Sequence, residues 1–447
     1  MIALRRRSFP QMTQFDHQQT GSADSPPTLK LDCNEQTFAA LGPLTEAYGD
    51  IVRVLCPERK HPQYLLSNPR DVKQVLVNHH RRYVKGVGFE RVEMLLGNGI
   101  IVSDGPFWRR QRTMIQPAFS RANIERLFTG IRQATERLAG RWNRLAESGE
   151  PLDLTTEMSR YALEVILQAL FSEDLEKLTD PGDQLAFAFL VEDPTRNLAV
   201  AMKFRQLLKR VQNLVEQRRA QQRRPFDLLS MMMDATASRS GEPMTDRELV
   251  DELATMIIAG HETSAGTLNW AWYLLSTHPD CEARLSAEST AVCPDGDWQY
   301  EQVGRLPYTQ QVIEETLRLY PPVWLYTRRA CEADQLGSHA IKPGDHIFLS
   351  PYLTQRLDRY WSEPARFEPD RFAEENRAQH VPYAFFPFSA GPRRCIGEYF
   401  SFIEMRTHLA MLCTRFRMEP VAGQRIELEP AINLRIRNSL LMHLEPK

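Results

Sequence analysis

The segment Phe-Ser-Ala-Gly-Pro-Arg-Arg-Cys-Ile-Gly, from Phe388 to Gly397, restricts what this chain can fold into more than any other feature. It fits the pattern F-x-x-G-x-R-x-C-x-G, in which a cysteine follows an arginine by two residues. A metal-binding cysteine must be a thiolate, and a thiolate needs positive charge and N–H donors nearby. Arg393 supplies charge, while Gly391 and Gly397 allow the backbone to turn tightly. Cys395 is therefore the first candidate for a metal ligand.

The residues after Cys395 predict a helix, because side chains of one face recur every three or four positions. They are Ile396, Phe400, Ile403, Thr407 and Met411. Cys395 would then lie at the helix N-terminus, where unpaired N–H groups and the helix dipole favour an anion. The other six cysteines have no short paired spacing, so we interpret them as free thiols in a reducing compartment.

A second strong feature is a long helix. Thr245 and Glu248 form a capping box at its start, apolar residues continue to Leu275, and Pro279 closes it. About 30 residues at a rise of 1.5 Å give a helix of ~45 Å, which crosses a whole domain.

The middle of this helix carries the polar run Ala259-Gly-His-Glu-Thr-Ser264. Polar residues in an otherwise apolar stripe often mark a functional site. Glu262 is suited to proton transfer, and the Thr263 hydroxyl competes with the hydrogen bonds of the helix backbone. The alternative is that Thr263 bonds to the preceding turn and Glu262 forms a surface ion pair. We interpret His261 as a structural or surface residue.

A third feature is the pair Glu315 and Arg318, on a helix predicted to start near Pro307 and to end at Pro321. A spacing of three residues puts the carboxylate and the guanidinium on one helix face, where they can pair. Bidentate geometry makes arginine, and not lysine, the suitable cation.

These motifs resemble those of the cytochrome P450 family, over roughly residues 30 to 447. The resemblance implies a mainly α (α+β) fold, in which long helices enclose a haem beside a small β-rich lobe. It implies haem b as cofactor, with the Cys395 thiolate as axial ligand, and O₂ as co-substrate. Glu262 would relay protons and Thr263 would hydrogen-bond the oxygen, as the catalytic residues.

The resemblance also assigns residues around the haem. Glu315, Arg318 and Arg371 would form a structural lock behind it. Trp108 and Arg112 match a Trp-x-x-x-Arg motif for the haem propionates, which need cationic partners. The expected haem-binding residues are Trp108, Arg112, Ala259, Gly260, Arg328, Phe388, Gly391, Arg393, Cys395 and Gly397.

Two points stay open within this frame. Arg329 is an alternative to Arg328, and either Arg112 or Arg328 can instead be a surface residue. After Pro351 the family commonly has a His-Arg-Asp run, whereas this chain has Gln355-Arg-Leu-Asp. We expect the missing histidine to change local packing without abolishing catalysis.

Bulky apolar residues in two stretches, residues 85–99 and residues 323–326, predict a hydrophobic small-molecule substrate. The expected pocket residues are Phe89, Met94, Leu95, Val323, Trp324, Leu325 and Tyr326. Ordinary core positions are an equally good interpretation of them. The stretch from Asp183 to Arg205, broken at Pro194, would roof the pocket and is short, which favours a more open roof.

Composition sets the remaining bounds. The chain has 447 residues, 42% of them hydrophobic, and a net charge of −2, so a nucleic-acid binder steered by bulk charge is excluded. We expect residues 1–28 to be a disordered lead and residues 29–447 to be one haem domain. The N-terminus has no run of ~20 apolar residues, and we expect a cytoplasmic monomer without a membrane anchor.

Local patterns predict further elements. Residues 51–55 and 63–67 predict a β-hairpin, and 346–349 predict a strand. Residues 107–118, 122–147, 159–170 and the basic stretch 203–222 predict helices. We interpret the basic face of the last as a solvated surface.

The sequence thus predicts a haem-thiolate monooxygenase that inserts one oxygen atom into a hydrophobic substrate, by hydroxylation or epoxidation. No flavin or iron–sulfur segment is present, so a separate ferredoxin or flavodoxin with its reductase would supply electrons. Its docking face would include Arg109, Arg110 and Arg394. The alternatives are a non-oxidative or peroxide-using haem-thiolate enzyme and a haem-based ligand sensor.

Overall fold

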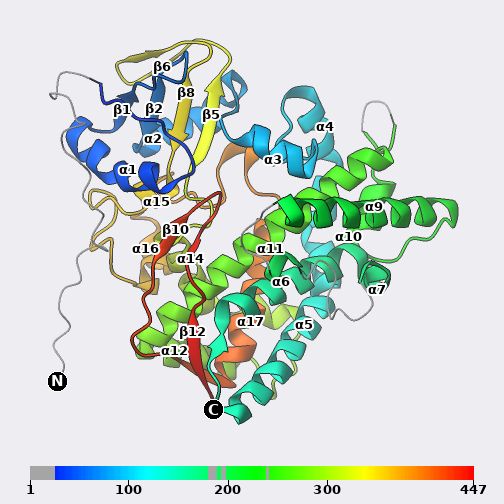
Figure 1. The fold of residues 1–447 in the computed structure, drawn as a ribbon. Helices are drawn as coiled ribbons and strands as arrows, with labels where there is room; N and C mark the ends of the chain where they lie inside the picture. Colours follow the sequence, from blue (N-terminus) through cyan, green and yellow to red (C-terminus); the bar gives the residue numbers. More distant parts are fainter. Residues whose placement is uncertain (1–25, 180–188, 193–197, 238–240) are drawn as a thin grey trace, which may run out of the picture.

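A computed structural model describes residues 26–179, 189–192, 198–237 and 241–447. Long helices fill one side of the molecule, and a smaller lobe that contains most of the strands lies at the other (Figure 1). The predicted mainly α fold with a small β-rich lobe is confirmed. The predicted N-terminal lead lies outside the described residues up to position 25, as do parts of the predicted roof.

The longest helix, α11 (Asp246–Thr277), crosses the middle of the molecule (Figure 1). The predicted capping box is present: the Glu248 N–H donates to the Thr245 hydroxyl, and the Glu248 carboxylate accepts from the Thr245 N–H. Eighteen of its residues are buried, so packing on several sides, and not propensity alone, stabilises it.

Helices α5, α6 and α17 pack around α11 and form the main core with it. The helix α6 begins five residues earlier than predicted because the Asp153 carboxylate caps it by accepting from the Thr156 N–H. The helices of this part are α4 (Gly105–Ile115), α5 (Arg121–Ser148), α6 (Leu154–Phe171), α7 (Leu175–Leu178), α8 (Phe189–Glu192), α9 (Leu198–Ala220), α10 (Leu228–Asp234), α12 (Pro279–Val292), α13 (Tyr300–Val303), α14 (Pro307–Leu319) and α17 (Glu398–Cys413).

The basic helix α9 is exposed along most of one face, with one exception. Arg218 is 1% exposed and donates to Asp174 and Asp227. These three residues form a buried ion-pair cluster that joins α9 to its neighbours. Removing one partner would be costly, because it would leave a buried charge unpaired.

The smaller lobe is built on a five-stranded sheet with the order β1-β2-β8-β5-β3. The predicted hairpin is present, with Ile51 opposite Leu66, and β2 pairs with β8 in parallel. Its strands are β1 (Ile51–Val54), β2 (Gln63–Leu66), β3 (Tyr83–Lys85), β5 (Tyr326–Ala330) and β8 (His346–Leu349).

The remaining strands form three smaller sheets. A three-stranded sheet has the order β4-β12-β9, and two hairpins are formed by β6-β7 and β10-β11. Their strands are β4 (Leu152–Asp153), β6 (Asp334–Leu336), β7 (His339–Ile341), β9 (Phe416–Pro420), β10 (Leu428–Pro430), β11 (Leu434–Ile436) and β12 (Leu441–Pro446). The short helices are α1 (Glu35–Tyr48), α2 (Pro69–Lys73), α3 (Phe89–Leu96), α15 (Pro351–Thr354) and α16 (Glu374–Arg377).

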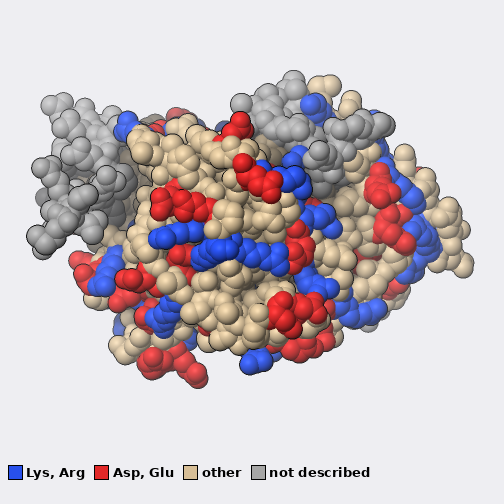
Figure 2. All heavy atoms as spheres, turned by 90° about the horizontal axis from the view of Figure 1, so that it is seen from below, with Lys and Arg blue, Asp and Glu red and all other residues tan. Residues whose placement is uncertain are grey.

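Surface charge is mixed on the face seen in Figure 2. A row of Lys and Arg side chains runs across it, with Asp and Glu groups on either side. This face has no extended field of one sign, which nucleic-acid binding would need. Among the helices of the described residues, none combines the length and apolarity that crossing a membrane requires.

Candidate haem-binding site

Cys395 lies just ahead of α17, whose first helical residue is Glu398. The backbone N–H groups of Gly397 and Glu398 bond to its sulfur, and its own N–H donates to the Phe388 carbonyl at 2.9 Å. The sulfur therefore faces the unpaired donors of the first turn, as the sequence predicts.

The surroundings of the sulfur are both accessible and poorly hydrated. The Cys395 side chain is exposed, yet burial raises its pKa to about 11. The two N–H groups and Arg112 pull the pKa the other way, but less strongly. The thiolate form thus needs a further positive charge, which a bound metal ion supplies.

Of the two glycines of the motif, Gly391 is required by the protein's own packing and Gly397 is not. Gly391 has a φ of +66°, and a Cβ there would lie 2.2 Å from the carbonyl oxygen of Leu76. Its tight turn is as predicted, but the group that comes close is this carbonyl. A Cβ on Gly397 would meet no atom within 4 Å. The side chain of Phe388 packs on Phe402, with ring centroids 5.5 Å apart.

A cluster of four cations surrounds one carboxylate beside Cys395. Asp104 accepts from Arg393 and from the backbone N–H of Lys85. Lys85 and Arg328 lie opposite each other on β3 and β5. Burial is the main cause of the lowered pKa of Lys85 and of Arg393; the charges of Arg328 and Arg393 add to the first shift, and those of Arg328 and Arg112 add to the second. Arg112 completes the cluster beside Arg393.

The arginines of this cluster differ in their partners. Arg393 donates to the Ser103 carbonyl at 2.7 Å and stacks over Trp108, 3.8 Å from the ring centroid. Arg328 is 6% exposed, and among the described residues its guanidinium bonds only to the Thr327 carbonyl. Arg112 and Arg328 form no ion pair with a carboxylate in the described part of the chain. The neighbouring Arg329 is exposed.

These residues fit a haem. One carboxylate opposes four cations, so the cluster is suited to a dianionic group such as the two haem propionates. Lys85 and Asp104 were missed by the sequence analysis, because neither belongs to a spaced motif. The β3–β5 register, which brings Lys85 beside Arg328, could not be read from the sequence.

The middle of α11 has a partly accessible stripe. Ala259, Glu262 and Thr263 lie on it, whereas the adjacent His261 is buried and hydrogen-bonds with Ser159 at 2.7 Å. This agrees with the interpretation of His261 as structural. The Thr263 hydroxyl donates to the Ala259 carbonyl at 2.7 Å, which is the back-bonded state that the sequence left open.

Two contacts of this part of α11, one at Gly260 and one at Glu262, were not indicated by the sequence. A Cβ on Gly260 would lie 3.1 Å from Ile166 of α6, so its small size serves the close approach of α6 and α11. The Glu262 carboxylate accepts from the side-chain amide of Asn433, in the β10–β11 hairpin.

The predicted lock is assembled. Arg318 donates from Nε and Nη2 to the Glu315 carboxylate at 2.6 and 2.8 Å, and both side chains are fully buried. Arg371 joins them, with its Nε 3.4 Å from Glu315 Oε1. Arg318 also donates to the carbonyls of Gln355, Pro364 and Arg366. The ion pair thus fixes an irregular segment that has few backbone partners of its own.

Gln355, which stands where the family has a histidine, connects this lock to the cysteine segment. Its side-chain amide donates to the carbonyls of Leu317 and Arg318 at 3.0 and 3.1 Å. Its oxygen accepts from the Phe386 N–H at 3.0 Å. All three groups of the amide are used, and the side chain is fully buried. A neutral histidine has one donor and one acceptor, so it could make only two of these bonds.

The predicted pocket residues are not all placed alike. Phe89, Leu95, Val323 and Tyr326 are partly exposed. Met94 is 73% exposed, and Trp324 is fully buried in the core of the smaller lobe. The expectation that Met94 and Trp324 line a pocket does not fit these positions. Leu325 is also buried.

The predicted docking residues also differ. Arg109 is exposed, but Arg110 pairs with Glu248 at 2.8 Å and Arg394 pairs with Glu398. Two of the three charges are therefore partly neutralised within the chain.

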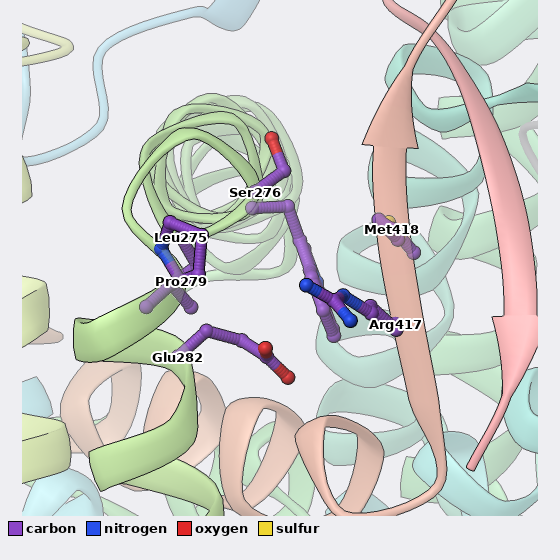
Figure 3. A pocket seen from close by; sticks show the side chains of 7 residues that line it. Leu275, Ser276, Pro279, Glu282, Arg417 and Met418 are labelled. Carbon is purple, nitrogen blue, oxygen red and sulfur yellow. The ribbon is translucent and has the colours of Figure 1, made fainter. Parts of the chain in front are cut away.

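A small cavity lies between the end of α11, α12 and β9, where the side chains labelled in Figure 3 converge. Its volume is about 10 Å³, which is room for one water molecule. A second hollow, of about 410 Å³, is lined by residues near the start of α11 such as Glu93, Glu248 and Asp251. Neither is suited to an apolar substrate, one by its size and the other by its charge.

Comparisons with known proteins show the family of this chain. The family model described as Cytochrome P450 matches residues 28–442. Cyclooctatin synthase of Streptomyces melanosporofaciens is 34% identical over 87% of this chain and 87% of its own. Cyclooctat-9-en-7-ol 5-monooxygenase of the same organism is 30% identical, over 84% of each chain. Pentalenene oxygenase of Streptomyces avermitilis is 32% identical, over 85% and 87%.

Among solved structures, the cytochrome P450DA haem domain superposes with a TM-score of 0.82 and covers 92% of this chain and 93% of its own. At 23% identity this similarity establishes the fold.

Proposed function

The chain belongs to the cytochrome P450 family, and from this premise we propose that it is a haem-thiolate monooxygenase that oxidises a cyclic terpenoid. The observation that carries the proposal is the Cys395 sulfur, which meets the N–H groups of Gly397 and Glu398 beside a cluster of unbalanced cations. The terpenoid class is supported by the names of relatives that act on cyclooctat-9-en-7-ol and pentalenene.

In this proposal, haem bound to the Cys395 thiolate supplies the activation of O₂, with one oxygen atom going to the substrate and the other to water. Arg112, Arg328, Arg393 and Lys85 would hold the two propionates through charged hydrogen bonds.

The residues of α11 would move protons. Thr263 would release its bond to the Ala259 carbonyl and donate its hydroxyl proton toward the site, which would leave that carbonyl free to accept from water. Glu262 takes a proton from solvent and passes it on, and its carboxylate is then restored. The alternative is that Thr263 stays bonded to the Ala259 carbonyl and has only a structural role. Thr263→Ala tests it: a larger share of electrons going to peroxide supports participation of the hydroxyl, and an unchanged share supports the structural role.

Electrons would come from a ferredoxin or flavodoxin with its reductase, docked near Arg109 on the Cys395 side. Arg110 and Arg394 would add less than their charges suggest, because each already has a carboxylate partner. We further propose that the protein works as a monomer in the cytoplasm. The rate of haem reduction by each carrier, measured at rising salt, tests the docking, since steering by charge weakens with ionic strength.

The first test is the carbon monoxide difference spectrum of the dithionite-reduced protein. A strongly red-shifted Soret band supports thiolate ligation, and a band at the position of imidazole-ligated haem would refute it. Cys395→Ser should lose the red-shifted band.

The second test is a spin-state titration with pentalenene and with cyclooctat-9-en-7-ol, with dodecanoic acid as comparison. A spin shift with either terpenoid, at concentrations where the fatty acid gives none, supports the substrate class. The reverse order would overturn it while leaving the monooxygenase proposal intact.

A further inference from the structure

The β10–β11 hairpin reaches the proton-transfer residue of α11. Asn433, which lies directly before β11, donates its side-chain amide to the Glu262 carboxylate. Both side chains are partly buried. The two residues are far apart in the sequence, and the strand β11 packs against α11 in the fold. No motif of the chain indicated this contact.

The hairpin is fixed on both sides of Asn433. Before it, the Ala431 carbonyl accepts from the indole N–H of Trp324 at 2.8 Å. After it, the Leu434 N–H donates to the Pro322 carbonyl at 2.8 Å. The position of Asn433 is therefore set by residues 322–324.

That segment is itself held in place and adjoins the expected substrate pocket. Trp324 is fully buried, its ring packs edge-on against Phe38 with centroids 5.3 Å apart, and its carbonyl accepts from the Ser350 hydroxyl at 2.7 Å. The adjacent Val323 is partly exposed. A substrate that moves this short segment would move Asn433 with it.

The chemistry of an amide suits it to this role. A neutral amide N–H orients a carboxylate without neutralising it, so the carboxylate stays able to accept a proton. A lysine or arginine at the same place would pair with the charge and oppose protonation. An amide therefore fixes the direction of a proton relay at little cost to its function.

We propose that Asn433 is a positioning residue for proton delivery. It holds the Glu262 carboxylate in place, and the hairpin makes that place depend on residues 322–324, which adjoin the expected substrate pocket. The inference rests on the proposed role of Glu262 and deepens it, because it names what regulates the relay. Glu262 gains and loses one proton in each delivery, so the balance of the reaction is unchanged.

The test compares Asn433→Ala with Asn438→Ala, which removes an exposed amide just beyond the same hairpin. With a plant-type ferredoxin, its reductase and NADPH, but no organic substrate, the protein reduces O₂ to peroxide or to water. Each peroxide consumes one NADPH, and each O₂ reduced to water consumes two. We expect Asn433→Ala to raise the peroxide share by about twofold or more, because general acid catalysis depends on position, and Asn438→Ala to leave it unchanged.

A second readout does not depend on turnover. In a double-mutant cycle of Asn433→Ala and Glu262→Ala, measured by urea unfolding, the two changes should be non-additive, because the residues are in contact. Additive changes would overturn the contact. Non-additive changes with an unaltered peroxide share would show a structural bond only and would also overturn the proposal.

The link to residues 322–324 has its own matched pair. Trp324→Phe removes the indole N–H that holds Ala431. Trp142→Phe makes the same change at a fully buried tryptophan whose indole N–H has no hydrogen-bond acceptor among the described residues. We expect only Trp324→Phe to raise the peroxide share. Equal effects would refute the link. A wild-type protein without the red-shifted carbon monoxide band would overturn the proposed function, and this inference with it.

Discussion

The buried carboxyl group of Glu404 should make the stability of this protein depend on pH in a direction opposite to that of an ordinary carboxylate. Glu404 lies on α17, is 2% exposed and accepts a hydrogen bond from the Ser264 hydroxyl at 2.7 Å. Its other oxygen has no partner among the described residues. Burial raises its pKa from the ordinary 4.5 to about 8.

The sign of the effect follows from proton binding. The folded state keeps the Glu404 proton at pH values where the unfolded chain releases it, so stability falls as the pH rises from 4.5 to about 8 and is level above that. Each pH unit in this window costs about 1.4 kcal/mol, which gives about 3 kcal/mol at pH 7 and about 5 kcal/mol in full.

Glu404→Gln removes this dependence while keeping a group that can bond to Ser264. We expect the stability of the variant relative to the wild type to rise by about 1.4 kcal/mol per pH unit between pH 5 and pH 8. The assay is urea unfolding of the haem-loaded proteins at pH 5, 6, 7, 8 and 9. The free energy of unfolding at each pH is obtained by linear extrapolation to zero urea. The nearby His408, whose pKa burial lowers to about 3, contributes equally to both proteins and cancels in the difference.

Glu419→Gln, which makes the same change at an exposed carboxylate of β9, is the control. A difference between Glu404→Gln and wild type that stays constant from pH 5 to pH 9 would refute the reasoning, because it would mean that Glu404 ionises as easily in the folded protein as in the unfolded chain.

Three further outcomes are expected. Arg328→Leu should lose haem about tenfold faster or more, because a charged hydrogen bond is worth about 1.5–3 kcal/mol, whereas Arg329→Leu should lose haem at the wild-type rate. Haem transfer to apomyoglobin measures both rates, and equal rates would contradict the assignment of the buried arginine to the propionates. Gln355→Leu should lower the share of the red-shifted carbon monoxide band more than Thr354→Val, whose buried hydroxyl bonds to Ser67 and not to the cysteine segment; similar spectra would show that Gln355 only stabilises. Arg218→Met should destabilise the protein by about 3–5 kcal/mol, since it leaves buried carboxylates unpaired, whereas the partly exposed Arg219→Met should cost about 1 kcal/mol or less; urea midpoints decide, and a small loss at Arg218 would be the contrary result.

The sequence predicted best where chemistry forces residues to stand at fixed spacing. Cys395 needs helix N–H groups directly after it, and Glu315 and Arg318 need one helix face. Thr245 and Glu248 need a spacing of three positions, with two residues between them, to form a capping box. In each case the partners are local, so short-range geometry is enough.

Prediction failed where partners come from distant elements. Lys85 reaches Arg328 through the pairing of β3 with β5, and Asn433 reaches Glu262 through a hairpin. Neither the strand register nor the position of the hairpin can be predicted from a local sequence pattern. Hydrophobicity alone also could not separate a pocket residue from a core residue, which is why Trp324 was misplaced. At Gly260, a small residue was needed for a different neighbour from the one the resemblance implied.

Arg318 holds the neighbouring segment through backbone carbonyl groups, which every residue has. It binds the carbonyls of Gln355, Pro364 and Arg366, and Gln355 in turn binds the Phe386 N–H. Because these attachments are to the main chain, they constrain few side chains of residues 356–385 other than that of Arg371, which belongs to the lock. Outward-facing positions between residues 356 and 385 can therefore change freely in evolution, and the surface on that side can be rewritten for new partners while the cysteine loop stays where it is.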